Sequence, residues 1–213
     1  MTDQIENIKR DVRIALDQNM VSTQLLSTED IDTLSLDDII ESKIIEAARL
    51  VTRDAPLYLL DGGSSFGESI HWFSREGFGG GYIVLPTDFL RLVAFQMSDW
   101  DYPVTTAITE DSPLYPLQSS RYGGVRGNPQ NPVVAIISEY PLLLEFYSCT
   151  AGAGVSVKSA KYIPYPKIEN GQLTFCEKLR PAIIYYTAYL TALTIGNGDA
   201  ATAMLNTSKE LMQ

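Results

Sequence analysis

Apolar residues recur at helical spacing near the N-terminus of the chain. They lie three or four positions apart, which is the spacing of one face of a helix. The positions are Ile5, Ile8, Val12 and Leu16 in a first series and Ile40, Ile44, Ala47 and Val51 in a second. Asp3 and Glu6 resemble a capping pair for the first helix, and Ser35 and Asp38 form a capping box for the second. The pattern predicts two helices within residues 1–56, which would form part of a helical layer.

The last part of the chain, residues 173–213, predicts two helices folded back on each other. Pro181 stands where the first turn of a helix tolerates proline. The sequence Gly196–Asp199 ends that helix, and Asp199 is expected to cap the next one. Alanines on the second helix let two helix axes approach closely. We therefore expect a compact αα-hairpin that completes the helical layer.

The middle of the chain, residues 57–172, has a different pattern. Short runs rich in β-branched and aromatic residues alternate there with clusters of glycine and proline, as in a series of strands. The runs are 57–60, 70–73, 82–85, 90–97, 132–137, 142–147 and 155–162. The loop between them at about 101–131 is long for a compact domain, so we expect it to be functional or ordered by a partner. The expected fold class is α+β, with helices from both chain ends packed together and a strand-rich antiparallel insert between them.

Composition excludes several kinds of protein. The 213 residues carry 16 basic and 26 acidic side chains, a formal charge of −10. That balance argues against a protein whose main task is to grip a phosphate backbone. Cys149 and Cys176 are the only cysteines, and their separation does not suggest a metal site, so we expect no disulfide, metal or cofactor. No apolar run of about 18 residues occurs and the polar N-terminus does not resemble a secretion signal, so no membrane partner is expected.

One motif suggests an enzyme. The sequence Gly63-Ser64-Ser65-Phe66-Gly67 matches the G-x-S-x-G nucleophile elbow of serine hydrolases. That elbow requires a helix after the serine, followed by an acid and then a histidine along the chain. The only histidine, His71, lies six residues after Ser65, within a run typical of a strand. We therefore favour a hairpin loop over a catalytic site and assign no catalytic residue.

A small basic spot interrupts the acidic chain. Arg121 and Arg126 flank Tyr122-Gly123-Gly124 within the long loop. These residues could meet an acidic partner or DNA, although a solvated loop is the favoured interpretation.

The segment from Tyr82 to Leu92 resembles a known family. Its sequence, YIVLPTDFLRL, is similar to a strand-turn-strand motif of head–tail adaptor proteins from tailed bacteriophages. The extension through Trp100 most resembles connector proteins of phages that infect gut Bacteroidetes, including crAss-like phages. In those proteins a helical hairpin near the C-terminus follows the motif, as residues 178–213 would here.

The resemblance implies a structural virion protein at the neck between head and tail. Such proteins form a ring, typically of twelve copies, which docks below the portal protein, contacts a further tail or ring protein and extends the DNA channel. Genomic DNA would pass through the lumen without sequence-specific binding. The family motif is structural and implies no catalytic residue or cofactor.

Residues in the glycine-rich loops and the basic spot are candidates for contacts with these partners. They are Gly62, Gly63, Ser64, Ser65, Phe66, Gly79, Gly80, Arg121, Tyr122 and Arg126. Two other functions remain open: a small serine hydrolase that uses Ser65, and a monomeric module that binds a peptide or glycan through its aromatic loops. Oligomeric state separates the binding module from the ring protein.

Overall fold

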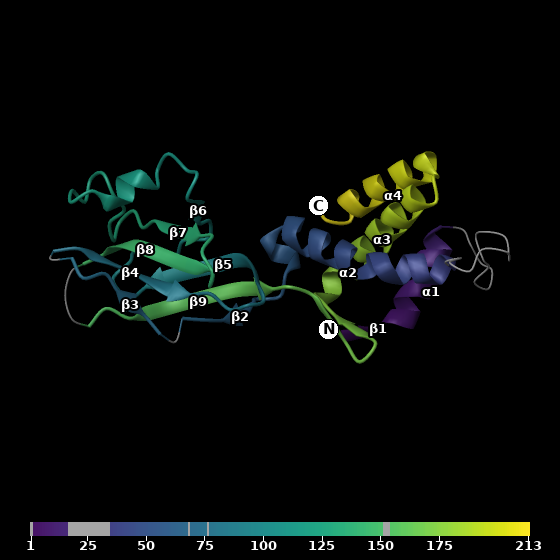
Figure 1. The fold of residues 1–213 in the computed structure, drawn as a ribbon, viewed down its shortest axis with the longest axis horizontal. Coiled ribbons are helices and arrows are strands. Elements are labelled where there is room, and N and C mark those ends of the chain that lie inside the picture. Colours follow the sequence, from purple (N-terminus) through teal and green to yellow (C-terminus); the bar gives the residue numbers. More distant parts are fainter. Residues whose placement is uncertain (1, 17–34, 68, 76, 151–153) are drawn as a thin grey trace. The chain divides into compact units, whose positions relative to one another are not determined.

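The protein is an α+β chain with helices at both ends, a strand-rich middle and a C-terminal pair of helices (Figure 1). The computed structural model describes residues 2–16, 35–67, 69–75, 77–150 and 154–213. It divides into two compact units. A helical unit contains residues 1–61 and 165–213, and a strand-rich unit contains residues 62–164.

The helical unit is built from four α-helices and one small sheet among the described residues. The helices are α1 (Ile5–Ala15), α2 (Leu36–Asp54), α3 (Arg180–Thr194) and α4 (Gly198–Glu210). The antiparallel sheet has the order β1 (Thr2–Gln4), β11 (Gln172–Thr174), β10 (Lys167–Glu169). Two 3₁₀ turns, η1 (Leu57–Leu59) and η3 (Glu177–Leu179), complete it. The helical layer is therefore assembled from both chain ends.

Capping residues explain where the N-terminal helices begin. The predicted capping box is confirmed at α2, where the amide of Asp38 donates to the Ser35 hydroxyl and the Asp38 carboxylate accepts from the Ser35 amide. The capping pair predicted at Asp3 and Glu6 is wrong, because the N-cap of α1 is Gln4 and makes no side-chain cap. The Asp3 carboxylate instead accepts hydrogen bonds from the side chains of Asn7 and Arg180.

The predicted αα-hairpin is present as α3 and α4. Pro181 lies in the first turn of α3, as expected, whereas the N-cap of α4 is Asn197 and not Asp199. The Asn197 side chain accepts a hydrogen bond from the Ala200 amide at 3.2 Å. Between the two helices, the buried Ser208 hydroxyl donates to the carbonyl of Ala182 at 2.9 Å. A side chain as small as serine lets α4 lie close enough to make this contact with the backbone of α3.

An ion-pair network joins the N-terminal segment to α3. The Arg180 guanidinium lies 2.7 Å from the Asp3 carboxylate through Nε and 2.7 Å from the Asp11 carboxylate through Nη2.

Two expected boundaries of the strand-rich region also shift, because β10 and β11 pair with β1 and the segment 57–60 forms η1 and not a strand. The strand-rich unit is consequently shorter than the range 57–172 expected from the sequence.

The strand-rich unit contains two sheets. A five-stranded sheet has the order β3-β4-β8-β7-β6, and a three-stranded sheet has the order β2-β9-β5. All pairs are antiparallel except β6–β7. The strands are β2 (Ser64–Ser65), β3 (His71–Trp72), β4 (Gly79–Val84), β5 (Phe89–Met97), β6 (Ile108–Thr109), β7 (Val134–Ile137), β8 (Leu143–Cys149) and β9 (Val157–Pro164).

Alternation along β8 gives the five-stranded sheet two apolar faces. Leu144 and Phe146 are fully buried in a core shared with Phe95 of the other sheet. Tyr147 points to the opposite face, because successive side chains of a strand alternate, and it packs there with residues outside the main core. Aromatic side chains from neighbouring loops, among them Phe73, Phe78 and Tyr115, pack against that second face.

The long loop expected at 101–131 is ordered by contacts within the chain itself. It contains β6 and the 3₁₀ turn η2 (Pro116–Ser119). Gln118 is 97 % buried, and its side-chain oxygen accepts from the amide of Gly127 while its side-chain nitrogen donates to the carbonyl of Leu114. A partner is therefore not needed to order this segment.

Candidate binding site

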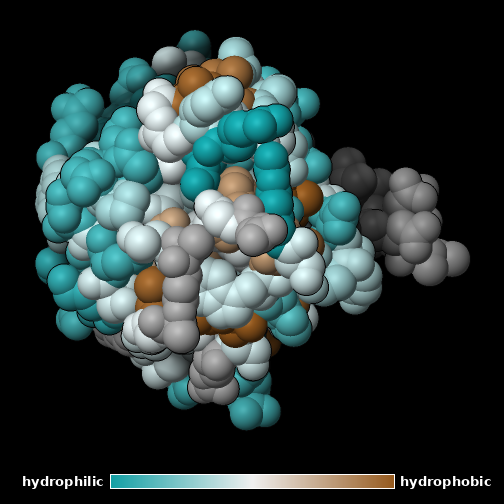
Figure 2. Space-filling view, turned by 90° about the vertical axis from the view of Figure 1, so that its left-hand side faces the viewer, coloured by the Kyte–Doolittle hydropathy of each residue, from teal (hydrophilic) through white to brown (hydrophobic). Residues whose placement is uncertain are grey.

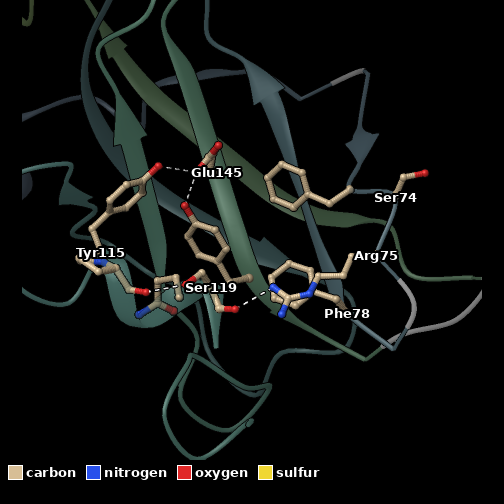
Figure 3. A pocket seen from close by; sticks show the side chains of 10 residues that line it. Ser74, Arg75, Phe78, Tyr115, Ser119 and Glu145 are labelled. Atoms are coloured by element: carbon tan, nitrogen blue, oxygen red, sulfur yellow. Dashed lines mark hydrogen bonds between the residues drawn. The ribbon is translucent and has the colours of Figure 1, made fainter. Parts of the chain in front are cut away.

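An aromatic cavity opens on the second face of the five-stranded sheet (Figure 3). Its volume is about 420 Å³, within the range of about 300–1,000 Å³ typical of small-molecule sites. Three segments distant in sequence line it. They are residues 73–75 and 78 between β3 and β4, residues 115, 116, 118 and 119 around η2, and Glu145 with Tyr147 from β8. We refer to it as the aromatic cavity.

Two tyrosines hold a carboxylate at the wall of this cavity. The hydroxyls of Tyr115 and Tyr147 both donate to Oε2 of Glu145, as the dashed lines of Figure 3 show. Burial, followed by the neighbouring charge of Glu145, raises the pKa of Tyr115. Burial and the hydrogen bond to Glu145 likewise raise the pKa of Tyr147. Both phenols therefore stay protonated as donors, and Glu145 stays fixed between them.

Two arginines lie against one aromatic wall. The guanidinium of Arg126 is 4.4 Å from the centre of the Phe78 ring, and that of Arg75 is 5.1 Å from the same ring. Arg75 also donates to the Ser119 carbonyl at 2.7 Å, and Arg126 to the Tyr147 carbonyl at 2.8 Å. Burial, and then repulsion by Arg75, lowers the pKa of Arg126. An anionic group placed near this pair would relieve that repulsion.

The arrangement suits a ligand with a flat apolar body and a negative group. Phe73, Phe78, Tyr115 and Tyr147 supply aromatic surface, which stacks favourably on another ring. Arg75 supplies positive charge at the lining. Nothing in the sequence pattern indicated this site, because its side chains come from loops and a strand that only the fold brings together.

The suspected nucleophile elbow has a different structure. Ser64 and Ser65 form β2 and pair with Tyr162 and Lys161 of β9, so the predicted hairpin loop is wrong. The elbow requires a helix directly after the serine, and none occurs among the described residues between Ser65 and β3. Ser65 and His71 both line a second cavity, of about 380 Å³. No acidic side chain of the described residues lines that cavity, and the His71 ring stacks on Tyr82 at 4.8 Å.

Several of the predicted interface residues pack inside the strand-rich unit instead. Gly79 and Gly80 are buried in β4, and a Cβ on Gly79 would lie 2.0 Å from the Cys149 carbonyl oxygen. Gly63 adopts a φ of +77° against the backbone of Tyr162. The ring of Phe66 packs against Phe89, Phe95 and Tyr162. Gly79, Gly80 and Phe66 therefore serve close packing, while Gly62, Gly63, Ser64 and Ser65 are exposed.

The residues of the basic spot also differ in how exposed they are. Arg121 and Tyr122 are exposed, whereas Arg126 is half-buried against Phe78. Other exposed apolar residues of this loop are Leu114, Leu117 and Val125. On the face of the strand-rich unit shown in Figure 2, apolar residues lie in separate patches between polar ones.

The segment that resembles phage adaptors has a structural role here. It forms the end of β4, a turn and the start of β5. The Asp88 carboxylate in the turn accepts a hydrogen bond from the Tyr162 hydroxyl of β9 at 2.8 Å. Burial, followed by this hydrogen bond, raises the pKa of Tyr162 to about 12. The turn is thereby attached to the neighbouring strand.

Within the described ranges, no group of three or more His, Cys, Asp or Glu side chains is arranged to hold a metal ion. Cys149 and Cys176 are both free thiols and belong to different units. None of the helices in the described residues combines the length and apolarity needed to cross a membrane. No protein-family model matches the chain, and no curated protein matches it significantly.

Proposed function

We propose that this chain is a non-enzymatic subunit of a head–tail connector in a tailed bacteriophage. In this proposal it forms a ring, of about twelve copies as the resemblance implies, below the portal protein in the virion neck. The ring contacts a further tail or ring protein on its other side. Genomic DNA passes through its lumen without sequence-specific binding.

The observation that carries the proposal is the order of elements. The adaptor-like segment forms a strand, a turn and a strand, and two antiparallel helices follow it near the C-terminus. A helical unit made from both chain ends encloses the strand-rich insert along the sequence. This is the arrangement that the resemblance implies. A shared order of elements is an analogy of fold, so the proposal is tested by whether the chain assembles into a ring.

Exposed apolar side chains on the C-terminal helices fit a subunit with neighbours. Leu193 and Ile195, at the end of α3, are 49 % and 41 % exposed, and Leu211, just after α4, is 40 % exposed. A heterologous contact repeated around an axis closes a ring and would cover such residues.

Charge distribution fits a DNA channel that does not hold its contents. The helical unit carries 17 acidic and 10 basic side chains, and the strand-rich unit nine and six. Neither unit has the excess of Lys and Arg that phosphate binding requires. A wall with net negative charge would reduce adhesion of DNA.

The test is mass photometry of the purified chain, alone and mixed with the portal protein encoded in the same genome. Particles of ring size, or stoichiometric addition to the portal ring, would support the connector. A monomer that ignores the portal at all concentrations would refute it. In that case the aromatic cavity would favour the second candidate, a monomeric binding module, and ligand screening would follow.

A further inference from the structure

The most exposed large hydrophobic side chain of the described residues is that of Tyr140. It lies in the turn between β7 and β8, and its exposed fraction reaches 102 %, so it makes essentially no contact within its own chain. Tyrosine is enriched at protein interfaces, which makes this fully exposed ring a candidate contact.

The surroundings of Tyr140 are acidic. Glu139 precedes it and is exposed. The Glu110 carboxylate accepts a hydrogen bond from the Ser138 amide at 3.0 Å, which places a second negative charge beside the turn. We call residues 138–141 the hairpin tip. It presents one free aromatic ring flanked by carboxylates.

The aromatic cavity has the complementary properties. Its walls include Phe73, Phe78, Tyr115 and Tyr147, and Arg75 lies among its lining residues. The strand-rich unit has six basic residues, and three of them, Arg75, Arg121 and Arg126, lie on the two loops that line this cavity. An aromatic ring beside a carboxylate thus matches the aromatic lining of the cavity and the positive charge of Arg75, while Glu145, the acidic residue of the lining, is already engaged by the hydroxyls of Tyr115 and Tyr147.

We propose that Tyr140 of one copy of this chain inserts into the aromatic cavity of a neighbouring copy, with Glu139 placed against Arg75. The contact joins two different surfaces and is therefore heterologous, the type that repeats around a ring. The inference rests on the proposed ring function and adds to it the residues of one subunit interface.

Two single variants remove the two sides of this contact. Tyr140→Ala removes the inserted ring and leaves the cavity intact. Ser74→Trp adds a bulky ring at an exposed position on the edge of the cavity, where it would obstruct an entering side chain, and leaves the hairpin tip intact. Tyr102→Ala, another exposed tyrosine of the same unit, and Ser74→Ala, which leaves the cavity open, are the matched controls. Circular dichroism and thermal unfolding confirm that each variant is folded.

Sedimentation velocity over a concentration series measures self-association. We expect the wild-type chain and both controls to associate, and Tyr140→Ala and Ser74→Trp each to weaken association roughly thirtyfold, the scale of a central interface tyrosine. An equimolar mixture of the two defective variants should form a 1:1 dimer, because one intact tip and one intact cavity remain. The double reversal Glu139→Arg with Arg75→Glu should restore association that each single reversal weakens.

Three results would overturn the inference. They are wild-type chains that stay monomeric up to about 1 mM, defective variants that associate like wild type, and a mixture that gives no dimer. Addition to the portal ring separates this failure from failure of the proposed function. If wild type and Tyr140→Ala both form rings on the portal, the connector stands and only this interface is wrong. If neither self-association nor portal binding occurs, both proposals fail.

Discussion

Replacing Arg180 by methionine should release the N-terminal segment of the helical unit. Arg180 is the one cation placed 2.7 Å from both Asp3 and Asp11 among the described residues, and it connects α3 to β1 and α1. Methionine keeps the length and the apolar stem of the side chain but removes the charge. Two carboxylates would then remain close together without their shared partner.

The size of the expected loss of stability follows from how deeply the three charged side chains are buried. The side chains of Arg180, Asp3 and Asp11 are 26 %, 10 % and 22 % exposed. Exposed ion pairs contribute about 0–1 kcal/mol, whereas breaking a fully buried pair costs about 3–5 kcal/mol. Partial burial places this network between those limits, so we expect Arg180→Met to lower the free energy of unfolding by about 2–3 kcal/mol.

The assay combines urea unfolding with hydrogen exchange of the α1 amides. Arg180→Met should increase exchange in α1 before the rest of the unit opens. The control is Lys43→Met, which breaks a 3.8 Å pair with Glu46 within α2 and should cost less than about 0.5 kcal/mol. Equal effects of the two variants, or unchanged exchange in α1, would refute the proposed role of Arg180.

The network also predicts a dependence on pH. Burial by itself acts to raise the pKa of Asp3, but hydrogen bonds from Asn7 and Arg180 outweigh it and hold the pKa below its ordinary value of 3.8. A folded-state pKa below the unfolded value adds stability above the unfolded pKa, and that stability is lost as the pH falls through the folded value. The difference between wild type and Arg180→Met should therefore be largest above pH 4 and shrink below it.

Three further substitutions test packing, each measured by urea unfolding. Gly79→Ala should cost more than about 3 kcal/mol because its Cβ would overlap the Cys149 carbonyl, while Gly123→Ala, with nothing within 4 Å, should change stability by less than about 0.5 kcal/mol. Phe66→Ala should cost about 2–4 kcal/mol through loss of its aromatic contacts, whereas exposed Ser65→Ala should be nearly neutral; the reverse order would contradict the packing role. Ser208→Ala should cost about 1–2 kcal/mol by removing a buried hydrogen bond between α4 and α3, and an unchanged midpoint would contradict a stabilising role of this contact.

Local signals determined much of the helical unit from the sequence alone. Apolar spacing predicted the helices near both chain ends, and the box at Ser35 and the proline at 181 indicated where two of them begin. These features act over one or two helical turns, so neighbouring residues suffice to reveal them. The same local reasoning failed where two candidates competed, as at Asn197 and Asp199, because both are good capping residues and the turn between the helices selects one.

Only the tertiary structure decided the role of the central residues. Gly79, Gly80 and Phe66 looked available for partners, yet pairing of β4 with β8 buries the two glycines and Phe66 packs, partly buried, against the core between the sheets. The aromatic cavity depends on bringing together residues 73–75 and 78, residues around η2, and Glu145 with Tyr147, whose separation along the chain carries no periodic signal. Helix and strand patterns come from neighbours in sequence, whereas cavities and buried loops come from neighbours in space, and those exist only once the sheets have paired.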